Sequence, residues 1–343
     1  MKVAVVGASG YSGGELLRLI AGHPQFQLHS AIAHSNAGEA IGAIHPQLAS
    51  VYSGDFQALK NIDLAEVDLL FFALPHGESG KLVAEHQNLL ASKKIVDLGA
   101  DFRLSSPEQW EKYYGGKHHG AWQYGLPELP GARAAIQTSE KIANPGCYAT
   151  ALTLSIAPFT QLSSKVNLAD IVITAASGTS GAGRSAKVNL IGSEVMNSLS
   201  AYKVGGVHQH TPEIEQAISR ITGNSVALSF TPILAPMPRG ILASVSIPIS
   251  GSSITEIREI FSASYSNEKF VHLLPEGQWP QTNSLVGSNG IQLQVALDEH
   301  VGRAIVIAAI DNLGKGAAGQ AIQNANLMTG IAEDSGLSAV GVR

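Results

Sequence analysis

Cys147 is the only cysteine among 343 residues, and it directly follows the turn-forming segment Asn144-Pro145-Gly146. The stretch after it predicts a helix from about residue 147 to residue 158. A thiol in the first turn of a helix faces the positive end of the helix dipole and unpaired N–H groups, which stabilise the thiolate. The alternative is an inert core residue, since free cysteines are usually buried. The position just after a predicted nucleotide-binding domain, where two domains would meet, favours a nucleophile.

Two histidines, His208 and His210, are candidates for the proton partner that a thiol nucleophile needs. One residue separates them, so in an extended segment both rings would point to the same side. Thr211 and Pro212 then predict the start of an amphipathic helix, with Thr211 as the N-cap and Pro212 at the first helical position. A metal pair is not expected, because no second cysteine or paired carboxylate accompanies the histidines. One histidine is expected to act as acid and base for Cys147, and the other to contact substrate or serve the structure.

Two further segments carry groups that suit an anion. Residues 175–187, AASGTSGAGRSAK, follow a predicted strand, and Ser177, Gly178 and Arg184 would form an anion-binding nest there. Residues 237–250 begin a strand with Arg239, whose guanidinium suits a carboxylate or a phosphate. The plainer interpretations are a flexible loop for the first segment and a surface ion pair for the second.

The elements that must position these groups begin at the N-terminus. Residues 2–22 predict a strand, a glycine-rich turn and a helix closed by Gly22, which is the first half of a βαβ unit. The glycines Gly7, Gly10 and Gly13 have the spacing G-x-x-G-x-x-G. Small residues let the main chain approach a pyrophosphate, whose charge meets the N–H groups at the helix N-terminus. A tight turn alone would also need glycines, but this placement predicts a dinucleotide site.

The end of the second predicted strand, within residues 26–38, bears on the choice of dinucleotide. An NAD site usually has Asp or Glu there, whereas this chain has His34, Ser35 and Asn36. A carboxylate would repel a 2′-phosphate, while Ser35 and neighbouring amides can donate hydrogen bonds to it. The sequence therefore favours NADP(H) over NAD, with a simple turn as the alternative.

The alternation of strand and helix continues after this point. Residues 67–77 predict a buried strand, residues 78–94 a helix, and residues 94–104 a strand with a polar end. In open parallel sheets, ligands bind at the carboxyl ends of the strands. The residues expected at these ends are Pro75, His76, Gly77, Asp101 and Arg103.

The second half has a different order of elements. Its predicted strands are mostly neighbours in sequence, which favours a mixed or largely antiparallel sheet. We expect strands at 225–236, 239–249, 291–298 and 303–311, and helices near 211–222 and 253–265.

Composition limits the possible classes of protein. A chain of 343 residues usually forms two domains, and 45% hydrophobic against 14% charged residues fits a globular protein. A net charge of −5 without a basic run gives no case for nucleic acid or an anionic membrane. No signal peptide is visible, the apolar runs are too short to span a bilayer, and one cysteine fits a reducing compartment. A soluble, cytoplasmic protein is expected.

Six motifs occur in an order that resembles the N-acetyl-γ-glutamyl-phosphate reductases of arginine biosynthesis, within the aspartate-semialdehyde dehydrogenase superfamily. They are VVGASGYSGGELLRLI, ANPGCYAT, SGTSGAGR, GGVHQHTPEI, PMPRGI and DNLGKGAAGQAIQN, and the resemblance covers the chain from residue 2 to about residue 330. The resemblance implies an NADPH-dependent oxidoreductase that converts an acyl phosphate to an aldehyde through a thioester. N-acetyl-γ-glutamyl phosphate would give N-acetylglutamate semialdehyde and phosphate.

The resemblance also assigns residues. Cys147 matches the nucleophile, His208 the acid/base and Tyr202 a tyrosine that assists them, while His210 lies near the substrate. The cofactor residues that it implies, together with those from the glycine turn and strand ends, are Gly7, Ser9, Gly10, Tyr11, Ser12, Gly13, Ser35, Pro75, Ser177, Gly178, Asn312 and Gly314. The expected substrate contacts are Arg103, Asn144, Arg184, His210 and Arg239, and no metal is expected.

The fold expected on these grounds is α/β, with a Rossmann-type dinucleotide-binding domain and an α+β catalytic and oligomerisation domain. The resemblance suggests that the last helical stretch, 314–330, packs on the first domain, so the domains would be 1–148 with 314–343, and 149–313. A homodimer or homotetramer is expected. The alternatives are the same chemistry on aspartyl phosphate or a carrier-bound aminoadipyl phosphate, and a regulator that binds NADP without catalysis. A glyceraldehyde-3-phosphate type of dehydrogenase is disfavoured by the missing acidic residue after the second strand.

Overall fold

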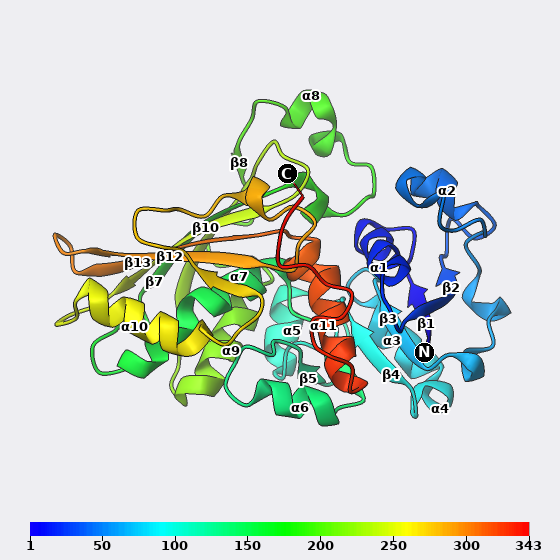
Figure 1. Ribbon diagram of the computed structural model, residues 1–343, viewed down its shortest axis with the longest axis horizontal. Helices are drawn as coiled ribbons and strands as arrows, with labels where there is room; N and C mark the ends of the chain where they lie inside the picture. Colours follow the sequence, from blue (N-terminus) through cyan, green and yellow to red (C-terminus); the bar gives the residue numbers. More distant parts are fainter. Residues whose placement is uncertain (343) are drawn as a thin grey trace. The chain divides into compact units, whose positions relative to one another are not determined.

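The computed structural model describes residues 1–342 (Figure 1). The chain divides into two units. Unit 1 comprises residues 1–127, 131–145 and 317–337, and unit 2 comprises residues 128–130, 146–316 and those from Ser338 onward. Cys147 therefore belongs to unit 2. The residues after 337 also group with unit 2, because Ser338 accepts a main-chain hydrogen bond from Asn289 and Val342 donates one to Val286.

Unit 1 is built on a six-stranded sheet with the order β2-β1-β3-β4-β6-β5, in which all pairs are parallel. Its strands are β1 (Lys2–Val6), β2 (Gln27–Ile32), β3 (Leu69–Phe72), β4 (Lys94–Asp97), β5 (Gln123–Tyr124) and β6 (Lys141–Ala143). Its helices are α1 (Tyr11–Ala21), α2 (Ile41–Ile44), α3 (Glu78–Glu85), α4 (Gln87–Leu90), α5 (Pro107–Tyr113), α6 (Ala132–Thr138) and α11 (Gly319–Met328). The predicted Rossmann-type topology is confirmed.

Alternating side chains of β1 divide the core of unit 1 into two layers. Val3 and Val5 pack with α1 and α11 on one face, whereas Ala4 and Val6 pack with Leu70 on the other. A sheet buried on both faces explains why the β3 sequence is apolar throughout. Two predicted elements are shorter than expected: the helix at 78–94 is interrupted at His86, and the strand that begins at Lys94 ends at Asp97.

Unit 2 contains a seven-stranded mixed sheet with the order β11-β12-β13-β10-β7-β9-β8, as predicted for this half. Pairs β7–β9 and β11–β12 are parallel, and the others are antiparallel. The strands are β7 (Ile171–Ser177), β8 (Ser200–Ala201), β9 (Leu228–Leu234), β10 (Ile241–Pro248), β11 (Val271–Leu273), β12 (Ile291–Asp298) and β13 (Arg303–Ile310). The helices are α7 (Cys147–Ile156), α8 (Gly192–Val195), α9 (Thr211–Thr222) and α10 (Ile254–Tyr265).

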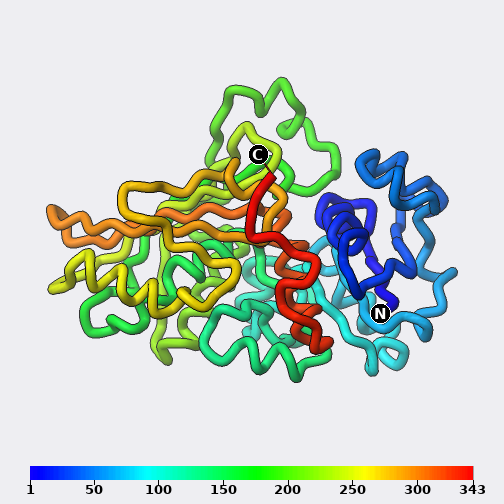
Figure 2. Tube along the Cα trace, viewed as in Figure 1, coloured from blue at the N-terminus to red at the C-terminus, as the bar shows by residue number. Residues whose placement is uncertain are grey.

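Helices cover one face of this sheet. In Figure 1, α7, α9 and α10 lie on the same side of the strands. The β10 sequence alternates accordingly, with Ile241, Ala243 and Val245 buried and Leu242 40% exposed. Between β7 and β9 the chain makes a long excursion that contains α8 and β8 (Figure 2). No helix formed by residues 1–342 combines the length and apolar character needed to cross a membrane.

Candidate active site

Cys147 is the first residue of α7, as the sequence predicts, and its side chain is half-buried. The other nine residues of the helix are all buried, so the helix runs through the core of unit 2 and only its start is accessible. Gly146 is the N-cap, and no side chain caps the helix there. The thiol therefore stands at the positive end of a fixed helix, which favours the thiolate.

An aromatic cluster joins the predicted catalytic residues. Tyr148, the neighbour of Cys147 in sequence, has its ring 5.4 Å from that of His208 and 6.0 Å from that of His210. The hydroxyl of Tyr202 donates to the hydroxyl of Tyr148 at 3.1 Å. Unit 2 thus brings the rings of Tyr148, Tyr202, His208 and His210 into one cluster at the start of the helix that begins with Cys147. Burial raises the pKa of Tyr202 to about 12, so its phenol stays protonated and can donate.

His208 is a neutral donor in this cluster. Burial, with a smaller contribution from the Lys203 charge, lowers the pKa of His208 to about 4. Its Nδ1 accepts the main-chain N–H of His210 at 3.1 Å. A neutral ring that accepts at Nδ1 carries its proton on Nε2.

The turn that contains the two histidines differs from the prediction. Residues 208–210 form a turn instead of an extended segment, and His210, not Thr211, is the N-cap of α9. The segment turns because the His210 N–H bonds back to the ring of His208. The rings still lie together, with centroids 5.0 Å apart. Because the helix begins one residue earlier than predicted, Pro212 is its second residue instead of its first and still lies in the first turn.

Glu213 is a residue of this site that the sequence analysis did not identify. Its side chain is 1% exposed, and Oε1 accepts the N–H of Gly146 at 2.8 Å. The ring of His210 occupies the space beside Gly146, because a Cβ there would lie 2.4 Å from Nε2. The start of α9 therefore holds the N-cap of α7. The only sequence signal was an acidic side chain at the third residue of a predicted helix, next to the histidine pair.

A second set of contacts holds the turn after β13. Asp311 is fully buried, and its carboxylate forms an ion pair with Arg239 at 2.8 Å and accepts the N–H groups of Leu313 and Gly287. Asn312 accepts from the N–H of Gly240 at 2.8 Å and donates to Ser180 Oγ at 2.9 Å. The turn that carries Asn312 and Gly314 is thereby fixed to the strand β10 and to the loop after β7.

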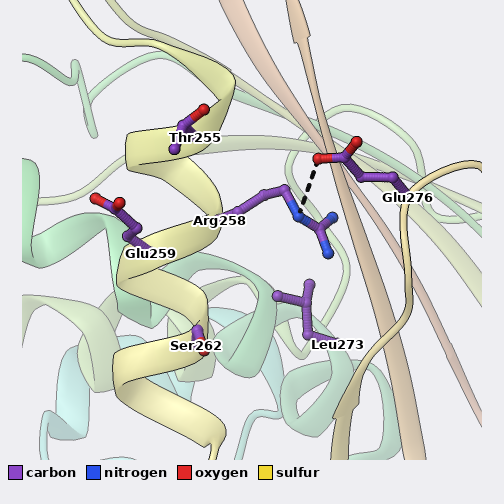
Figure 3. Close-up of a pocket in the computed structure, with 6 residues that line it drawn as sticks. All are labelled: Thr255, Arg258, Glu259, Ser262, Leu273 and Glu276. Atoms are coloured by element: carbon purple, nitrogen blue, oxygen red, sulfur yellow. Dashed lines mark ion pairs between the residues drawn. The ribbon is translucent and has the colours of Figure 1, made fainter.

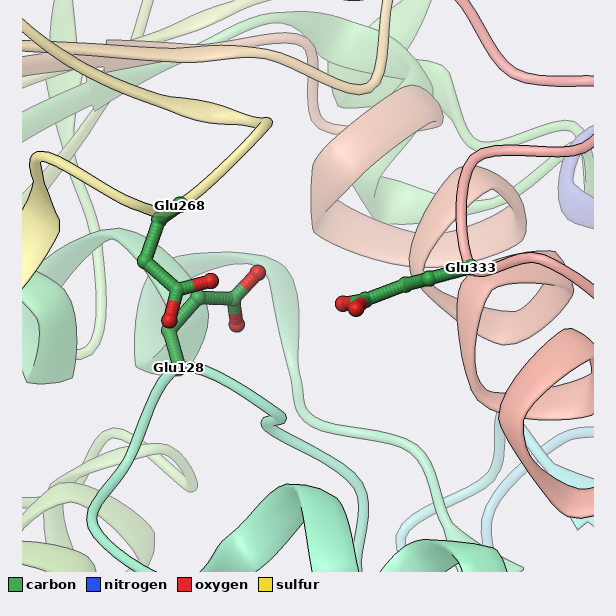
Figure 4. Close-up of side chains that lie close together, drawn as sticks. All are labelled: Glu128, Glu268 and Glu333. Atoms are coloured by element: carbon green, nitrogen blue, oxygen red, sulfur yellow. The ribbon is translucent and has the colours of Figure 1, made fainter.

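The same turn lies against the cysteine. A Cβ at Gly316 would stand 2.8 Å from the Cβ of Cys147, so this position has room only for glycine. Next to it, the fully buried ammonium of Lys315 pairs with Glu128 at 2.5 Å and faces the ring of Phe270. Glu268 brings a second carboxylate within 4.8 Å of Glu128 (Figure 4). Lys315 supplies the positive charge that the buried carboxylate of Glu128 requires.

The predicted anion loop is ordered against β10. Gly178 donates its N–H to Gly240 and leaves no room for a side chain, because a Cβ would lie 2.9 Å from the main chain of Arg239. Ser177 is 3% exposed, whereas Arg184 lies in an exposed segment.

The glycine turn of unit 1 has the form that a dinucleotide needs. Gly7 has φ +87°, and a Cβ there would lie 2.3 Å from the carbonyl oxygen of Ala73. A Cβ at Gly13 would lie 2.4 Å from the carbonyl oxygen of Gly7. The N-cap of α1 is Gly10, so no side chain caps the first N–H groups of the helix, and the first turn of α1 has no acidic residue. Main-chain N–H groups at the start of α1 therefore suit a phosphate.

The loop after β2 contains a carboxylate that the sequence analysis did not consider. The amide of Asn36 donates to Glu39 at 2.9 Å, and the hydroxyl of Ser35 donates to Asn36 at 3.2 Å. Ser35 and Glu39 are exposed. The side-chain amide of Asn36, next to Ser35, is thus hydrogen-bonded to a carboxylate.

Two of the predicted substrate residues make structural contacts in unit 1. Arg103 is 4% exposed and donates to the main-chain carbonyls of Asn144 and Leu98, both at 2.8 Å. The side chain of Asn144 is fully buried, donates to Ala317 O and accepts from Asn324. These contacts hold the strand end that leads to Cys147. Pro75 is exposed in the loop after β3. The substrate roles of Arg103 and Asn144 stay predictions.

A separate hollow of about 290 Å³ lies beside α10 (Figure 3). Its lining residues are Thr255, Arg258, Glu259, Ser262, Leu273 and Glu276. The Arg258 guanidinium donates to Gln294 at 2.6 Å and to Leu274 O at 3.0 Å, and it pairs with Glu276 at 3.6 Å. Because these contacts already engage the guanidinium of Arg258, the lining residues that the structure describes have no cation left to bind a charged ligand.

Comparisons with known proteins agree with this architecture. Residues 2–139 match the family model "Semialdehyde dehydrogenase, NAD binding domain", and residues 147–312 match "Semialdehyde dehydrogenase, dimerisation domain". Aspartate semialdehyde dehydrogenase II of Vibrio cholerae, in a structure titled as a complex with ASA, superposes with a TM-score of 0.71 at 18% identity and covers 96% of this chain and 98% of its own. An aspartate semialdehyde dehydrogenase of Candida albicans, solved with NADP, gives 0.67 at 15% identity, over 96% and 98% of the two chains. At these identities the structures support the fold alone.

Unit 1 has a glycine turn before α1, and unit 2 has a cysteine at the start of α7 and a pair of histidines in an aromatic cluster. Together with the two family models, these features define an oxidoreductase of the semialdehyde dehydrogenase class. Two curated relatives narrow the class, and both bear the name N-acetyl-gamma-glutamyl-phosphate reductase. The protein from Acidothermus cellulolyticus is 57% identical over 99% of this chain and 98% of its own, and that from Salinispora arenicola is 53% identical over 100% and 99%. The chain belongs to the N-acetyl-γ-glutamyl-phosphate reductase family.

Proposed function

We propose that this protein reduces N-acetyl-γ-glutamyl phosphate to N-acetylglutamate 5-semialdehyde with NADPH and releases phosphate. The observation that carries the proposal is Cys147 at the start of a buried helix, followed by Tyr148, whose ring lies against neutral His208 and whose hydroxyl accepts from Tyr202. The names of the relatives supply the substrate.

The chain's residues would act in two half-reactions. The Cys147 thiolate attacks the acyl carbon, the bond to phosphate breaks, and a thioester forms. A bound nicotinamide cofactor would supply the hydride that the thioester carbon needs, and the C–S bond to Cys147 would then break to release the aldehyde and return the thiolate. Gly7, Gly10 and Gly13 would hold the pyrophosphate of the cofactor, because they keep side chains away from the N–H groups of α1.

His208 has two expected roles that need different tautomers. Donating a hydrogen bond to the acyl oxygen as it gains negative charge needs the proton on Nε2, which is the form favoured by the His210 contact. Accepting the thiol proton at Nε2 needs that contact to be lost. We therefore propose that donation to oxygen is the main role of His208, and that Tyr202 adds a second donor when its O–H turns from the Tyr148 hydroxyl to the acyl oxygen.

Mass spectrometry of the acyl-enzyme would test the thioester. Protein mixed with N-acetyl-γ-glutamyl phosphate, without NADPH, should gain the mass of one N-acetylglutamyl group on Cys147, and the Cys147→Ala variant should gain none. An enzyme that turns over without any adduct at Cys147 would contradict the mechanism.

Kinetic assays of the reverse reaction would test substrate and cofactor. With phosphate and NADP⁺, N-acetylglutamate semialdehyde should be oxidised far faster than aspartate semialdehyde or an aminoadipyl semialdehyde on its carrier. NADP⁺ should support a higher kcat/KM than NAD⁺, with Ser35 supplying a donor for the 2′-phosphate. A protein that binds NADP⁺ but oxidises none of the aldehydes would be the non-catalytic regulator.

Arg184 and Arg239 are proposed to bind the acidic groups of the substrate, with His210 as a further contact. Arg239 would do so while paired with Asp311, so its role is tested by the KM for substrate in Arg239→Lys, which keeps the charge but loses the paired donors.

We further propose a homo-oligomer that forms through the sheet face of unit 2 opposite α7 and α10. Val172 and Leu242 on that face are 44% and 40% exposed, and the matched family model carries the word dimerisation in its description. Sedimentation equilibrium would distinguish a dimer or tetramer from a monomer. The cytoplasmic location stays a prediction, which cell fractionation would test.

A further inference from the structure

His45 is a buried histidine of unit 1 that the proposed chemistry does not use. Its side chain is 4% exposed, and it lies between α2 and the turn that begins at Pro46. Nε2 of its ring is 2.9 Å from the carbonyl oxygen of Ala8, in the glycine turn. A carbonyl oxygen only accepts, so the ring donates from Nε2.

Packing gives this ring a single position. A Cβ at Gly14 would lie 2.5 Å from Cε1 of His45, so the ring occupies the space that a side chain on α1 would otherwise fill. Phe56 meets the ring edge-on, with centroids 5.9 Å apart. The main-chain N–H of His45 donates to Ile41 at 2.8 Å. The residue is thus anchored both by its ring and by its main chain.

The acceptor belongs to the peptide group that joins Ala8 to Ser9. In a trans peptide the C=O and N–H groups point in opposite directions, and residues 1–342 contain no cis peptide bond. By holding the Ala8 carbonyl, His45 turns the N–H of Ser9 away from its own ring. The hydrogen bond also polarises the peptide group, which makes that N–H a stronger donor.

The main chain also makes contacts in this turn, and they lie on either side of this peptide. The N–H groups of Gly7 and Ala8 both donate to Ile32 O at 2.9 Å, and Gly10 donates to Gly7 O at 3.2 Å. They fix the start of the turn and its end, whereas His45 fixes the peptide between them.

We propose that His45 is a positioning residue of the dinucleotide site, which aims the N–H of Ser9 at the cofactor pyrophosphate. This rests on the dinucleotide-binding role of the glycine turn. His45 acts through the peptide and does not touch the cofactor.

Two amide variants test the proposal, because they differ in the reach of their donor. The amide nitrogen of His45→Gln can occupy the position of Nε2, whereas that of His45→Asn reaches only the position of Nδ1. Fluorescence titration of the full chain with NADPH measures the Kd of each variant. The Kd of His45→Asn should be about five- to tenfold higher than that of the unchanged protein, because about one hydrogen bond is lost. The Kd of His45→Gln should stay within about twofold of that of the unchanged protein. At saturating NADPH, kcat of both variants should stay within about twofold.

A cofactor fragment and a control variant separate positioning from loss of structure. Adenosine 2′-monophosphate, which lacks the pyrophosphate, should bind His45→Asn as it binds the unchanged protein. His23→Asn is the matched control: His23 is 7% exposed and bonds to Phe26 N and to Asn326 near the other end of α1. It should lower the melting temperature without changing the Kd for NADPH.

Equal NADPH affinity of His45→Asn and the unchanged protein would overturn the proposal, as would an equal loss of affinity for the fragment. Failure of the unchanged protein to bind NADPH would instead overturn the dinucleotide role itself.

Discussion

The candidate sites of the two units differ in the chemical groups that form them. In unit 1 the site is mainly backbone: Gly7 and Gly13 remove side chains so that the main chain and the start of α1 can approach a ligand. In unit 2 the site is mainly side chains: Tyr202, His208 and Glu213 are held by hydrogen bonds and ring contacts from separate elements, around the start of the helix that carries Cys147.

This difference determines which substitutions should damage each site. A backbone site is damaged by added atoms, since a Cβ at its glycines overlaps main-chain oxygen. A side-chain site is damaged by removed atoms, because a missing partner leaves a buried polar group without its hydrogen bond. Binding should therefore respond most to changes in unit 1, and the chemical step to changes in unit 2.

The largest effect is expected from His208→Asn. Removing the Nε2 donor should lower kcat by about 10²- to 10⁴-fold, with little change in the Kd for NADPH. Since burial lowers the pKa of His208 to about 4, the ring stays neutral from pH 8 to about pH 5. Protonation of Nδ1 would break its contact with the His210 N–H and disturb the turn, so the acidic limb of kcat/KM should lie near pH 4 and disappear in the variant. A limb near pH 6.5 that survives in His208→Asn would show that another group is responsible.

The next largest effects are expected from two glycine variants, one in each unit, which test whether unit 1 serves binding and unit 2 the chemical step. Gly316→Ala would place a Cβ 2.8 Å from that of Cys147 and displace the nucleophile, which should lower kcat about 10²-fold. Gly7→Ala would place a Cβ 2.3 Å from Ala73 O at a positive φ and should mainly raise the Kd for NADPH. Steady-state kinetics and NADPH titration of both variants check this crossed pattern. If both variants lost kcat and affinity alike, the two units would not divide these tasks.

Local pattern was enough to predict the elements that carry the site. The sequence predicts the strand, glycine turn and helix at residues 2–22, the helix that begins at Cys147, and α9 at Thr211–Thr222. Each has a signal within a few residues: buried apolar periodicity, a glycine or proline at the end, and a turn before it.

The contacts that position these elements join distant parts of the chain, and no local pattern reports them. Asp311 binds Arg239 and Gly287, Gly316 lies against Cys147, and His45 lies against Gly14. The strand β11 was also missed, because three residues paired in parallel with β12 carry too little pattern. Even the turn at His208 depends on a side chain that bonds to the main chain two residues later.

The third prediction concerns the stability of unit 1. Burial, with the nearby Asp101 charge, raises the pKa of Asp97 from 3.8 to about 7. The unfolded chain then loses this proton first, so the stability that protonated Asp97 contributes is present below pH 4 and is lost as pH rises through 7. Asp97→Asn does not titrate, and its oxygen can still accept from Ser79. Relative to the unchanged protein it should gain up to about 4 kcal/mol in free energy of unfolding between pH 4 and pH 8. Urea unfolding at both values checks this, and a constant difference would contradict the raised pKa.

The smallest effect is expected from Glu39→Gln, which changes charge but not shape in the backbone site. Glu39 accepts from Asn36 beside Ser35, so its negative charge would oppose a 2′-phosphate there. The variant should raise the ratio of kcat/KM for NADPH over NADH about two- to fivefold at low salt, because exposed charges interact weakly, and less at high salt. Glu66→Gln is the control: Glu66 pairs with Lys2 near the amino ends of β1 and β3, away from the cofactor side of the sheet. An equal change in both variants would mean that net charge, and not the loop after β2, sets the preference.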